Sequence, residues 1–527
     1  MNILVTGTEG YLGCLLAGVL MREGHEVLGV DTGYYKAGWL YNGVDLSPKT
    51  LEKDLRDITA EDLAGIDAIV HMAELSNDPL GQLAPNITYD VNHKGSVRLA
   101  NLARENGVRR FVYMSSCSVY GVATEPVVSE TSEINPQTAY AECKAMVERD
   151  VQPMAGDDFV PTFLRNSTAF GASPRQRFDI VLNNLMGLAW TTKEIKMISD
   201  GSPWRPLVHA LDIAKAISCV LDAPEDDVRG QILNVGSNEQ NYQVREIAEI
   251  VAEQVPGCTL SFGDGSDNRS YQVNFDKIHA TLPKFSCDWD ARRGAQQLAE
   301  VFARIDLDKE MFESRGFTRL SSSEYLISSG QLDSDFFWSP FVKFIETKLA
   351  GAFVVELEEH ADHRGFFART FWQDEFAAHG LKTSIAQANM SFNHRAGTLR
   401  GMHFQYPPAA ETKFIRCVTG ALYDVIIDLR PDSPTYLEHV GVELTQDNFR
   451  ALYVPERFGH GFITLADNTA AMYQVGEFYT PGMEAACATT TPISGSTGRS
   501  RPRSSRTRTA PGRRSPSSVP RSNPAWS

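Results

Sequence analysis

The sequence predicts two folded parts of different class, an α/β part followed by an all-β part. Within residues 1–337, apolar strands alternate with amphipathic helices, a pattern typical of a doubly wound parallel sheet of the Rossmann type. Beyond residue 342, short strands of alternating character follow one another with turn residues between them, which predicts an antiparallel jelly-roll barrel. A length of 527 residues also exceeds what one hydrophobic core usually supports.

Composition and charge narrow the class of protein. The net charge is −16, and the stretch 485–527 holds eight Arg and no acid, so subtracting those eight charges leaves −24 for the rest. An acidic body argues against nucleic acid or an anionic membrane as partner. The eight Cys are scattered without metal-ligand spacing, which is typical of reduced thiols. Since no apolar stretch reaches the length of a membrane span and no signal peptide is recognisable, we expect a cytoplasmic protein.

A glycine turn opens the chain. In "MNILVTGTEGYLGCLLAGVL", Gly7, Gly10 and Gly13 follow an apolar strand and begin a helix, so backbone N–H groups can meet a pyrophosphate. The next strand ends at Asp31, where a carboxylate would bind the adenosine ribose and repel a 2′-phosphate. The pattern predicts a dinucleotide site and favours NAD over NADP. Its expected cofactor contacts are Gly7, Gly10, Tyr11, Leu12, Gly13 and Asp31.

A tyrosine and a lysine stand four residues apart in "NPQTAYAECKAMVE". Tyr140 and Lys144 would share one face of a helix. A lysine near a phenol lowers the pKa of the phenol, which can then exchange a proton with a sugar hydroxyl. Taken alone, such a pair is more often surface packing than chemistry.

With the glycine turn, this pair resembles the extended short-chain dehydrogenase/reductase family of nucleotide-sugar enzymes. The resemblance spans 1–337 and includes "DVNHKG", "LRNSTAFGASPRQRFD" and "RPLVHALDIAKAI". It implies an NAD-binding core at about 1–165 and a substrate part at about 166–337. It also implies site roles for six residues: Tyr140 as acid/base with Lys144 as cofactor-binding partner, Ser116 on the substrate oxygen, Asp57 near the adenine, and Asn183 and Arg269 on the substrate diphosphate.

Two departures from the family sharpen this hypothesis. The 4,6-dehydratases of the family place Asp and Glu directly after the Ser116 position, where this chain has Cys117 and Ser118, so dehydration is not expected. Two reactions at a sugar C4 remain open, 4-epimerisation with retained NAD and net reduction of a 4-ketone. Glu74 stands where the family usually has a small residue, and the sequence assigns it no role.

The second part contains a set of polar and aromatic residues that could carry chemistry. Each has a structural alternative: a buried core imidazole, a turn residue or metal ligand, or packing in the wall of the barrel. Closely spaced His and Glu ligands of the metal-cupin kind do not occur, so no metal is expected. The set comprises Arg364, Arg400, His403, Lys413, His460, Tyr473 and Tyr479.

Their order resembles the dTDP-4-dehydrorhamnose 3,5-epimerase family, a metal-free and cofactor-free cupin-type barrel, over about 342–484. The matching motifs include "DHRGFF", "LRGMHFQ" and "DVIIDLRPDSPT". The resemblance implies that His403 is the general base, that Lys413 stabilises an enolate, and that Tyr473 protonates the opposite face. It further implies substrate contacts from Arg364, Phe367, Arg400, His460 and Tyr479. Both family resemblances imply homodimers.

The tail departs from that family after the second part, which we delimit as 342–486. Where the family has D-D-P-x-F-G-I-x-W-P and later an Asp that orients the catalytic histidine, this chain has "TTTPISGSTGR" and then Arg-rich residues. Codons for that string can be chosen so that the frame one base earlier reads DDPDFGIDWP. The hypothesis is a reading-frame shift near Cys487, which makes 487–527 a disordered and non-functional tail.

The sequence thus predicts a bifunctional nucleotide-sugar enzyme. An NAD-dependent epimerase or oxidoreductase would be fused to a dTDP-4-dehydrorhamnose 3,5-epimerase-like domain, supplying deoxysugars for a polysaccharide or a glycosylated natural product. One alternative is a 3,5-epimerase paired with a 4-keto reductase that together make a 6-deoxy-L-sugar. Another is a second domain that binds a nucleotide sugar without turnover.

Overall fold

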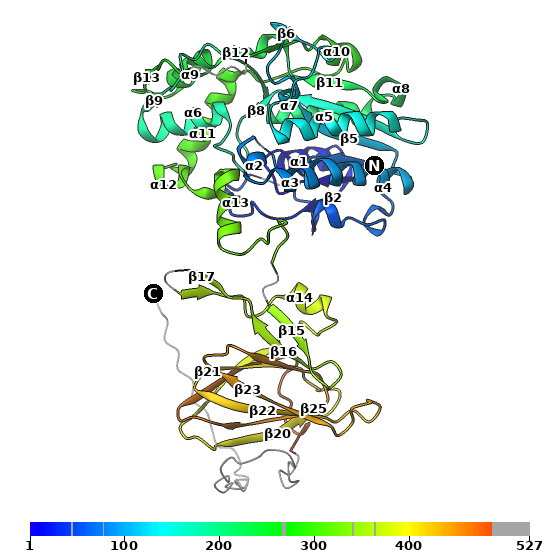
Figure 1. Ribbon diagram of the computed structural model, residues 1–527, viewed down its shortest axis with the longest axis vertical. Helices are drawn as coiled ribbons and strands as arrows, with labels where there is room; N and C mark the ends of the chain where they lie inside the picture. The colour runs from blue at the N-terminus through cyan, green and yellow to red at the C-terminus, as the bar shows by residue number, and fades with distance from the viewer. Residues whose placement is uncertain (44–45, 77, 266–269, 340–341, 363–364, 487–527) are drawn as a thin grey trace, which may run out of the picture. The chain divides into compact units, whose positions relative to one another are not determined.

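The computed structural model describes residues 1–486 apart from 44–45, 77, 266–269, 340–341 and 363–364. The chain divides into two compact units, Met1–Trp338 and a second unit that begins at Ser339 (Figure 1). Each unit is described by itself. The tail predicted at 487–527 lies outside the described residues.

The first unit is built on a seven-stranded sheet in the order β11-β7-β5-β4-β1-β2-β3, and every neighbouring pair is parallel. The predicted doubly wound parallel sheet is confirmed. Its strands are β1 Asn2–Thr6, β2 Glu26–Asp31, β3 Lys49–Glu52, β4 Ala68–His71, β5 Arg110–Ser116, β7 Val160–Asn166 and β11 Ile232–Val235.

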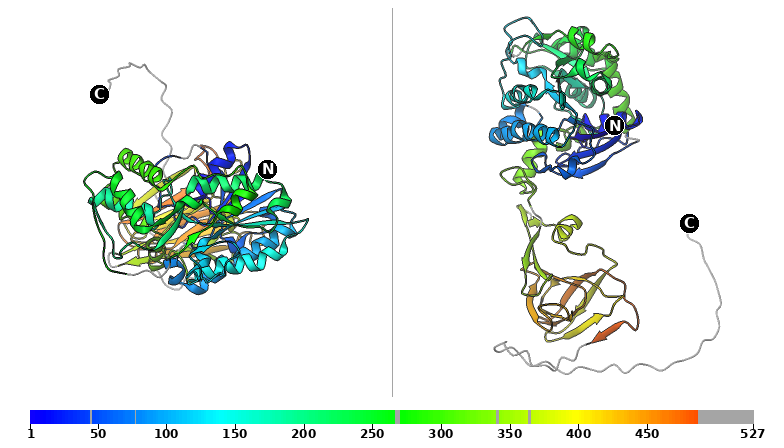
Figure 2. Two further views of the ribbon diagram at one scale, coloured as in Figure 1. Left: turned by 90° about the horizontal axis from the view of Figure 1, so that it is seen from above. Right: turned by 90° about the vertical axis from the view of Figure 1, so that its right-hand side faces the viewer.

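Helices cover both faces of this sheet (Figures 1 and 2). Alternate residues of β1 point to opposite faces, as the two-residue period of a strand requires. Ile3 packs in one core with α1 (Gly13–Arg22) and α7 (Ala210–Asp222). Leu4 packs in the other with α4 (Ser96–Glu105) and α5 (Ala139–Val151).

A smaller part of the first unit has a core of its own, formed by three helices and short strands. Phe178 and Phe302 lie in that core, with ring centroids 5.8 Å apart. Its main elements are β8 Thr168–Phe170, α6 Val181–Thr192, β10 Trp204–His209, β12 Asn241–Gln243, α9 Val244–Gln254 and α11 Ala291–Ile305. Shorter elements are α2 Asp78–Leu83, α3 Pro85–Thr88, η3 Tyr89–Gly95, η4 Cys117–Tyr120, β6 Val127–Val128, β9 Glu194–Lys196, α8 Glu225–Val228, β13 Thr259–Ser261, β14 Gln272–Val273, α10 Asp276–Thr281, α12 Lys309–Phe312 and α13 Arg319–Ser328.

The second unit packs two antiparallel sheets against each other, as the alternating strands predict. One has the order β15-β16-β24-β21-β26-β19 and the other β23-β22-β25-β20-β27, with a separate hairpin of β17 and β18. The strands are β15 Val342–Glu346, β16 Phe353–Leu357, β17 His360–Asp362, β18 Gly365–Phe367, β19 Gln387–Asn393, β20 Leu399–Gln405, β21 Lys413–Thr419, β22 Ala421–Asp428, β23 His439–Thr445, β24 Ala451–Val454, β25 Phe458–Thr464, β26 Thr469–Val475 and β27 Glu484–Ala486; one helix, α14, spans Gln373–Ala378.

The space between the two sheets is the core of the second unit. Ile415 and Leu452 enter it from the six-stranded sheet, and Leu422 and Phe462 enter it from the five-stranded sheet. The motif "DLRPDSPT" has a structural role here, because the buried Asp428 carboxylate accepts hydrogen bonds from Arg430, Ser433 and Thr435 and so fixes the β22–β23 turn.

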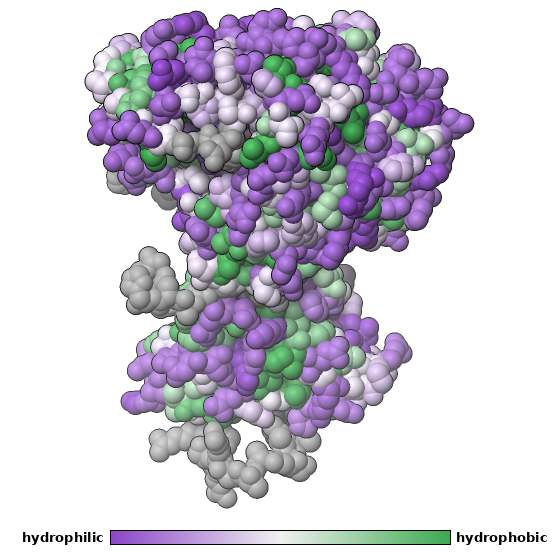
Figure 3. Space-filling view, turned by 45° about the horizontal axis from the view of Figure 1, so that its top comes forward, coloured by the Kyte–Doolittle hydropathy of each residue, from purple (hydrophilic) through white to green (hydrophobic). Residues whose placement is uncertain are grey.

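Most of the visible surface of the first unit is hydrophilic (Figure 3). Among the described residues, no helix combines the length and the apolar character that crossing a bilayer requires.

Candidate active sites

A cleft of about 360 Å³ opens in the first unit where the parallel strands end. Its lining includes all the cofactor contacts predicted from the glycine turn, Gly7, Gly10, Tyr11, Leu12 and Gly13, together with Asp31. Two of the glycines are required by geometry. Gly7 has φ +81°, and a Cβ on Gly13 would lie 2.0 Å from the Gly7 carbonyl oxygen. The turn therefore brings bare backbone to the start of α1, an arrangement that fits a pyrophosphate.

Asp31 ends β2 at the edge of the same cleft. Its carboxylate accepts hydrogen bonds from the backbone N–H groups of Glu9, at 2.9 Å, and Gly33, at 2.7 Å. Burial raises the pKa of Asp31, while the two amide donors lower it. The side chain thus ties the glycine turn to the segment that follows β2, in the position expected for a ribose ligand.

Ser116, Tyr140 and Lys144 all line the cleft, so the structure brings the predicted catalytic residues together. Ser116 is the last residue of β5 and caps η4 by accepting the Ser118 N–H. Tyr140 and Lys144 lie one turn apart on α5, whose N-terminus is capped by the Thr138 hydroxyl. The Lys144 Nζ is 5.4 Å from the centroid of the Tyr140 ring.

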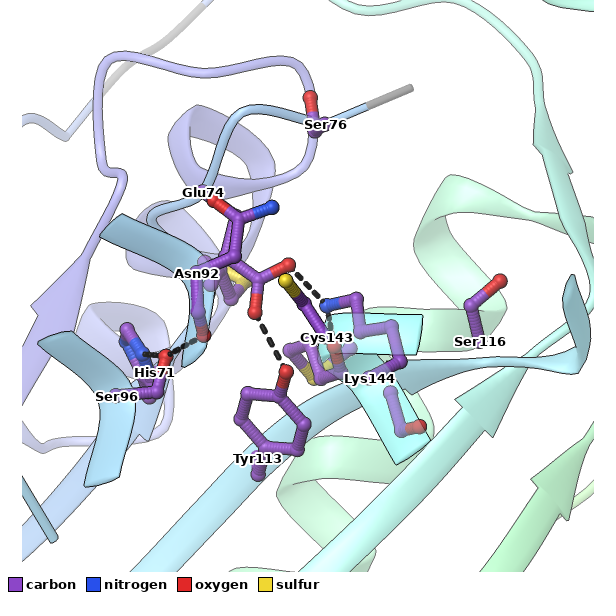
Figure 4. A network of polar contacts seen from close by, with 12 residues as sticks. His71, Glu74, Ser76, Asn92, Ser96, Tyr113, Ser116, Cys143 and Lys144 are labelled. Atoms are coloured by element: carbon purple, nitrogen blue, oxygen red, sulfur yellow. Dashed lines mark hydrogen bonds and ion pairs between the residues drawn. The ribbon is translucent and has the colours of Figure 1, made fainter. Parts of the chain in front are cut away.

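Glu74, which the sequence left without a role, contacts this lysine directly (Figure 4). Its Oε2 is 2.5 Å from the Lys144 Nζ, and its Oε1 accepts a 2.6 Å hydrogen bond from the Tyr113 hydroxyl. The side chains of Glu74 and Lys144 are 2% and 5% exposed. Lys144 also donates to the Met114 carbonyl. Burial disfavours the ammonium, but Glu74 and Tyr140 outweigh it and raise the pKa of Lys144.

Arginines supply positive charge to the same cleft. Arg177 and Arg319 both line it, and Arg177 forms a 2.7 Å ion pair with Asp179. The Arg319 guanidinium lies 3.9 Å from the centroid of the Tyr35 ring. Among the described residues Arg319 has neither an ion pair nor a side-chain hydrogen bond, and burial together with Arg177 lowers its pKa to about 10. The sequence reasoning missed both arginines.

Two predicted contacts lie elsewhere. Asp57 is exposed, and its neighbours Asp54 and Leu55 line the cleft instead, because η1 (Leu55–Asp57) turns the second carboxylate outward. Asn183 is fully buried and does not line the cleft. Its side chain accepts the Gly171 N–H and donates to the Arg177 carbonyl, so it supports the fold locally. Arg269 lies outside the described residues.

A smaller cavity of about 170 Å³ adjoins the first at Ser116 and Asn166. Arg205 and Tyr271 also line it. Cys117 lines this cavity too, but it is poorly suited to act as an acid. The residue is 2% exposed, its thiol donates to the Arg165 carbonyl, and burial raises the pKa of that thiol to about 12. Neither Cys117 nor Ser118 therefore supplies the acidic side chains that the 4,6-dehydratases have at these two positions.

The second unit places its candidate residues on adjoining strands. His403 on β20 is directly opposite His460 on β25. Lys413 is the first residue of β21, and its Nζ lies 3.0 Å from the Oε1 of Glu411. Tyr473 on β26 is paired with Ile415 on β21. Burial, and then Lys413 and His460, lower the pKa of His403.

Two further contacts organise this second site. The His460 Nε2 is 2.8 Å from the buried carboxylate of Asp424, and the Arg400 Nε donates to the Asn393 Oδ1 at 2.6 Å. Tyr479 and Phe367 are 58% and 65% exposed, so the described residues enclose neither side chain.

Arg364 lies outside the described residues. The described part of the chain contains no cluster of three His, Cys, Asp or Glu side chains suited to a metal ion.

The fold defines a protein of two units, a Rossmann-like α/β unit and an antiparallel β unit. Residues 3–236 match the model of the NAD dependent epimerase/dehydratase family, and residues 346–496 match that of dTDP-4-dehydrorhamnose 3,5-epimerase. The chain belongs to the dTDP-4-dehydrorhamnose 3,5-epimerase family through its second unit, which follows the segment that matches the NAD dependent epimerase/dehydratase model.

Relatives of the second unit are annotated enzymes of that family. The dTDP-4-dehydrorhamnose 3,5-epimerase of Methanothermobacter thermautotrophicus is 41% identical over 139 residues, which are 26% of this chain and 74% of that protein. The enzyme of the same name from Shigella flexneri is 40% identical over 141 residues, 27% of this chain and 77% of that protein.

Solved structures resemble the first unit. MoeE5 in complex with UDP-glucuronic acid and NAD is 25% identical, with a TM-score of 0.50, and the match covers 58% of this chain and 99% of MoeE5. The NAD-dependent NDP-hexosamine 5,6-dehydratase TunA covers the same shares at 22% identity and a TM-score of 0.52, a likeness of fold alone.

Proposed function

We propose that the chain is a bifunctional enzyme of nucleotide-linked deoxyhexoses. The first unit would carry out a hydride reaction at the sugar C4, and the second would invert C3 and C5 of a 4-keto sugar. The observation that carries the proposal is the single cleft that holds the glycine turn, Asp31, Ser116, Tyr140 and Lys144.

NAD fits the residues of that cleft. Gly7 to Gly13 would hold the pyrophosphate, and Asp31 would hold the adenosine ribose, where a 2′-phosphate would meet a carboxylate. When bound, NAD supplies the acceptor or donor of the hydride. Ser116 would bind the C4 oxygen, Tyr140 would move the proton of that oxygen, and Lys144 would orient the phenol. MoeE5, a neighbour in fold, carries both UDP-glucuronic acid and NAD, which supports a nucleotide sugar as substrate.

The second unit would use proton transfer alone. A C4 ketone acidifies the C–H bonds at C3 and C5. His403 would take such a proton, Lys413 would stabilise the negative charge on the enolate oxygen, and Tyr473 would give a proton to the opposite face of the carbon. Inversion results because one C–H bond breaks on one face and another forms on the other. The names of the relatives of this unit support a dTDP-linked substrate.

The tail bears on how fast that second reaction runs. We propose that residues from about Cys487 onward come from a shifted reading frame, so the carboxylate that orients the histidine in the family is missing. Without it, the His403 imidazole would be poorly held, and exchange at C3 and C5 should be slow. Sequencing the DNA around the Cys487 codon decides the matter: a gene with no shifted alternative frame removes the hypothesis.

One incubation separates the two activities. The protein would be mixed with dTDP-4-keto-6-deoxyglucose in D2O, with and without NAD(H) or NADP(H), and followed by NMR. We expect slow deuterium incorporation at C3 and C5 that His403→Ala removes, and reduction or epimerisation at C4 that Tyr140→Phe removes. Deuterium incorporation at a rate typical of the family would contradict the effect of the tail. No exchange and no product would instead favour a second unit that only binds nucleotide sugars.

A further inference from the structure

The ammonium of Lys144 is held by two residues that line the cleft with it, Glu74 and Met114. Its Nζ contacts the Glu74 carboxylate at 2.5 Å and donates to the Met114 carbonyl. An ammonium has three N–H donors, so one is left for the side of Tyr140 and the cofactor. The negative charge nearest to the Lys144 ammonium is therefore that of Glu74, a residue of the protein itself.

Glu74 is held firmly enough to act in this way. The Thr6 hydroxyl accepts the N–H groups of Met72 and Ala73, each at 3.0 Å, and therefore donates its own proton to the His71 Nδ1 at 2.7 Å. Asn92 fixes the other side of the segment by binding both backbone groups of Leu75. The backbone on both sides of Glu74 is thus held by hydrogen bonds.

The other titratable groups around Tyr140 are neutral or are bonded to partners of their own, so none takes the place of the Glu74–Lys144 ion pair. His71 is neutral, because burial and then Lys144 lower its pKa to about 3. Arg177 is paired with Asp179, and the buried Glu148 on α5 is paired with Arg165. Asp78, on α2, accepts the Thr138 hydroxyl. The remaining titratable neighbours, Tyr113 and Cys143, have raised pKa values, chiefly from burial, and stay uncharged.

The consequence falls on the Tyr140 phenol. Burial raises the pKa of Tyr140, Lys144 lowers it, and Glu74 raises it again. A lysine whose charge is neutralised 2.5 Å away stabilises a phenolate less than a free lysine does.

We propose that Glu74 is a positioning residue that acts through Lys144 and keeps the Tyr140 phenol protonated, ready to serve as an acid toward a sugar C4 carbonyl. The inference rests on the proposed function of the first unit. In that direction the Tyr140 O–H bond breaks, its proton forms the new O–H bond at C4, and the C–H bond is completed by hydride from a reduced nicotinamide. Of the two reactions left open, the arrangement favours 4-keto reduction.

The test is a titration that needs neither sugar nor cofactor. The full-length protein would be labelled with tyrosine carrying ¹³C at Cζ, and the Tyr140 resonance would be assigned by its loss in Tyr140→Phe. We expect Glu74→Gln to lower the midpoint of Tyr140 ionisation by at least about one pH unit, a tenfold change in its ionisation constant. The matched control is Glu142→Gln, an acid on α5 that bonds to Tyr89 instead and should leave the midpoint unchanged.

Two further variants test the route through Lys144. In a Lys144→Met background, Glu74→Gln should lose most of its effect on Tyr140. Glu74→Asp, which keeps the charge but shortens the side chain, should lower the midpoint by less and serves if Glu74→Gln does not fold. An unchanged midpoint in both Glu74 variants would overturn the inference. Failure of the sugar reaction alone would instead count against the proposed function, because the titration involves no turnover.

Discussion

The guanidinium of Arg319 is a buried positive charge in the cleft that forms no ion pair with a described residue, although the carboxylates of Asp179 and Asp31 attract it. Arg319 is only 3% exposed, and its guanidinium stacks on the ring of Tyr35 near Asp31. Burying a charge without a partner is costly, so a bound anion is the expected partner. Because the glycine turn lines the same cleft, we expect this anion to be a phosphate of the proposed dinucleotide.

We therefore expect Arg319→Met to weaken binding of ADP about tenfold, by loss of a charge-assisted hydrogen bond, and to leave adenosine binding unchanged. Isothermal titration calorimetry with both ligands measures the difference. The control is Arg304→Met, which removes another arginine stacked on a tyrosine, Tyr41, but one that does not line the cleft. Equal weakening of ADP and adenosine would contradict a phosphate contact, and 2′-AMP as a third ligand would reveal a 2′-phosphate site.

The pKa of His403 gives a second prediction at this scale. Burial, and then Lys413, lower it below the ordinary value of 6.5, so the imidazole stays neutral, and able to accept a proton, to lower pH than a free histidine. The rate of deuterium incorporation at C3 and C5 should fall only below pH 6.5. Lys413→Met should slow exchange by about 10²–10³ and move that fall to higher pH. A fall that begins above pH 6.5 in the unmodified protein would contradict this.

Residues differ in how well the sequence predicts their roles. The positions of Gly13 and Asp31 in the cleft were predictable, because strand, turn and helix fix where they lie from a few neighbours in the chain. The contact of Glu74 was not, since its partner Lys144 is 70 positions later and meets it only because α5 packs against β5, the neighbour of β4. Asp54 and Asp57 show the same limit: both stand in "DLRD", and only the local 3-10 turn decides which one lines the cleft.

At the scale of elements, β19 ends the six-stranded sheet and leaves one edge unpaired by the described strands. Its side chains alternate, and Met390 and Phe392 are 68% and 48% exposed. An apolar edge strand of this kind invites pairing with another chain, in line with the expected homodimer.

We expect Phe392→Glu to weaken self-association at least about 100-fold, because pairing at this edge would bury an unpaired carboxylate. Sedimentation velocity over a range of concentrations measures it. Leu437→Glu is the control, since Leu437 is 60% exposed in the β22–β23 turn, away from β19. If both variants associate like the unmodified protein, self-association does not use this edge.

The whole molecule consists of two units, each with hydrophobic cores of its own. The fold class of each unit was predictable from the sequence. Strands alternate with helices in the first unit, and apolar residues recur at every second position in the strands of the second, and neither pattern requires knowledge of contacts between distant residues. We expect two thermal transitions in calorimetry. Ile69→Ala should lower only the first-unit transition and Leu452→Ala only that of the second, each by about 2–5 kcal/mol of unfolding free energy, since both side chains are fully buried. A single transition shifted by both variants would show that the units unfold together.

The covalent joining of two self-sufficient units fixes their numbers as well as their sequence. Every copy of the chain carries one of each, so the ratio of the two proposed activities does not change with the level of expression. Joining also makes the chain bivalent. If each unit pairs with its own kind about a separate two-fold axis, successive pairings do not close, and the chains link into open filaments rather than discrete dimers. Light scattering on the intact chain would then report a mass that keeps rising with concentration, whereas two coincident axes would hold it at twice the chain mass.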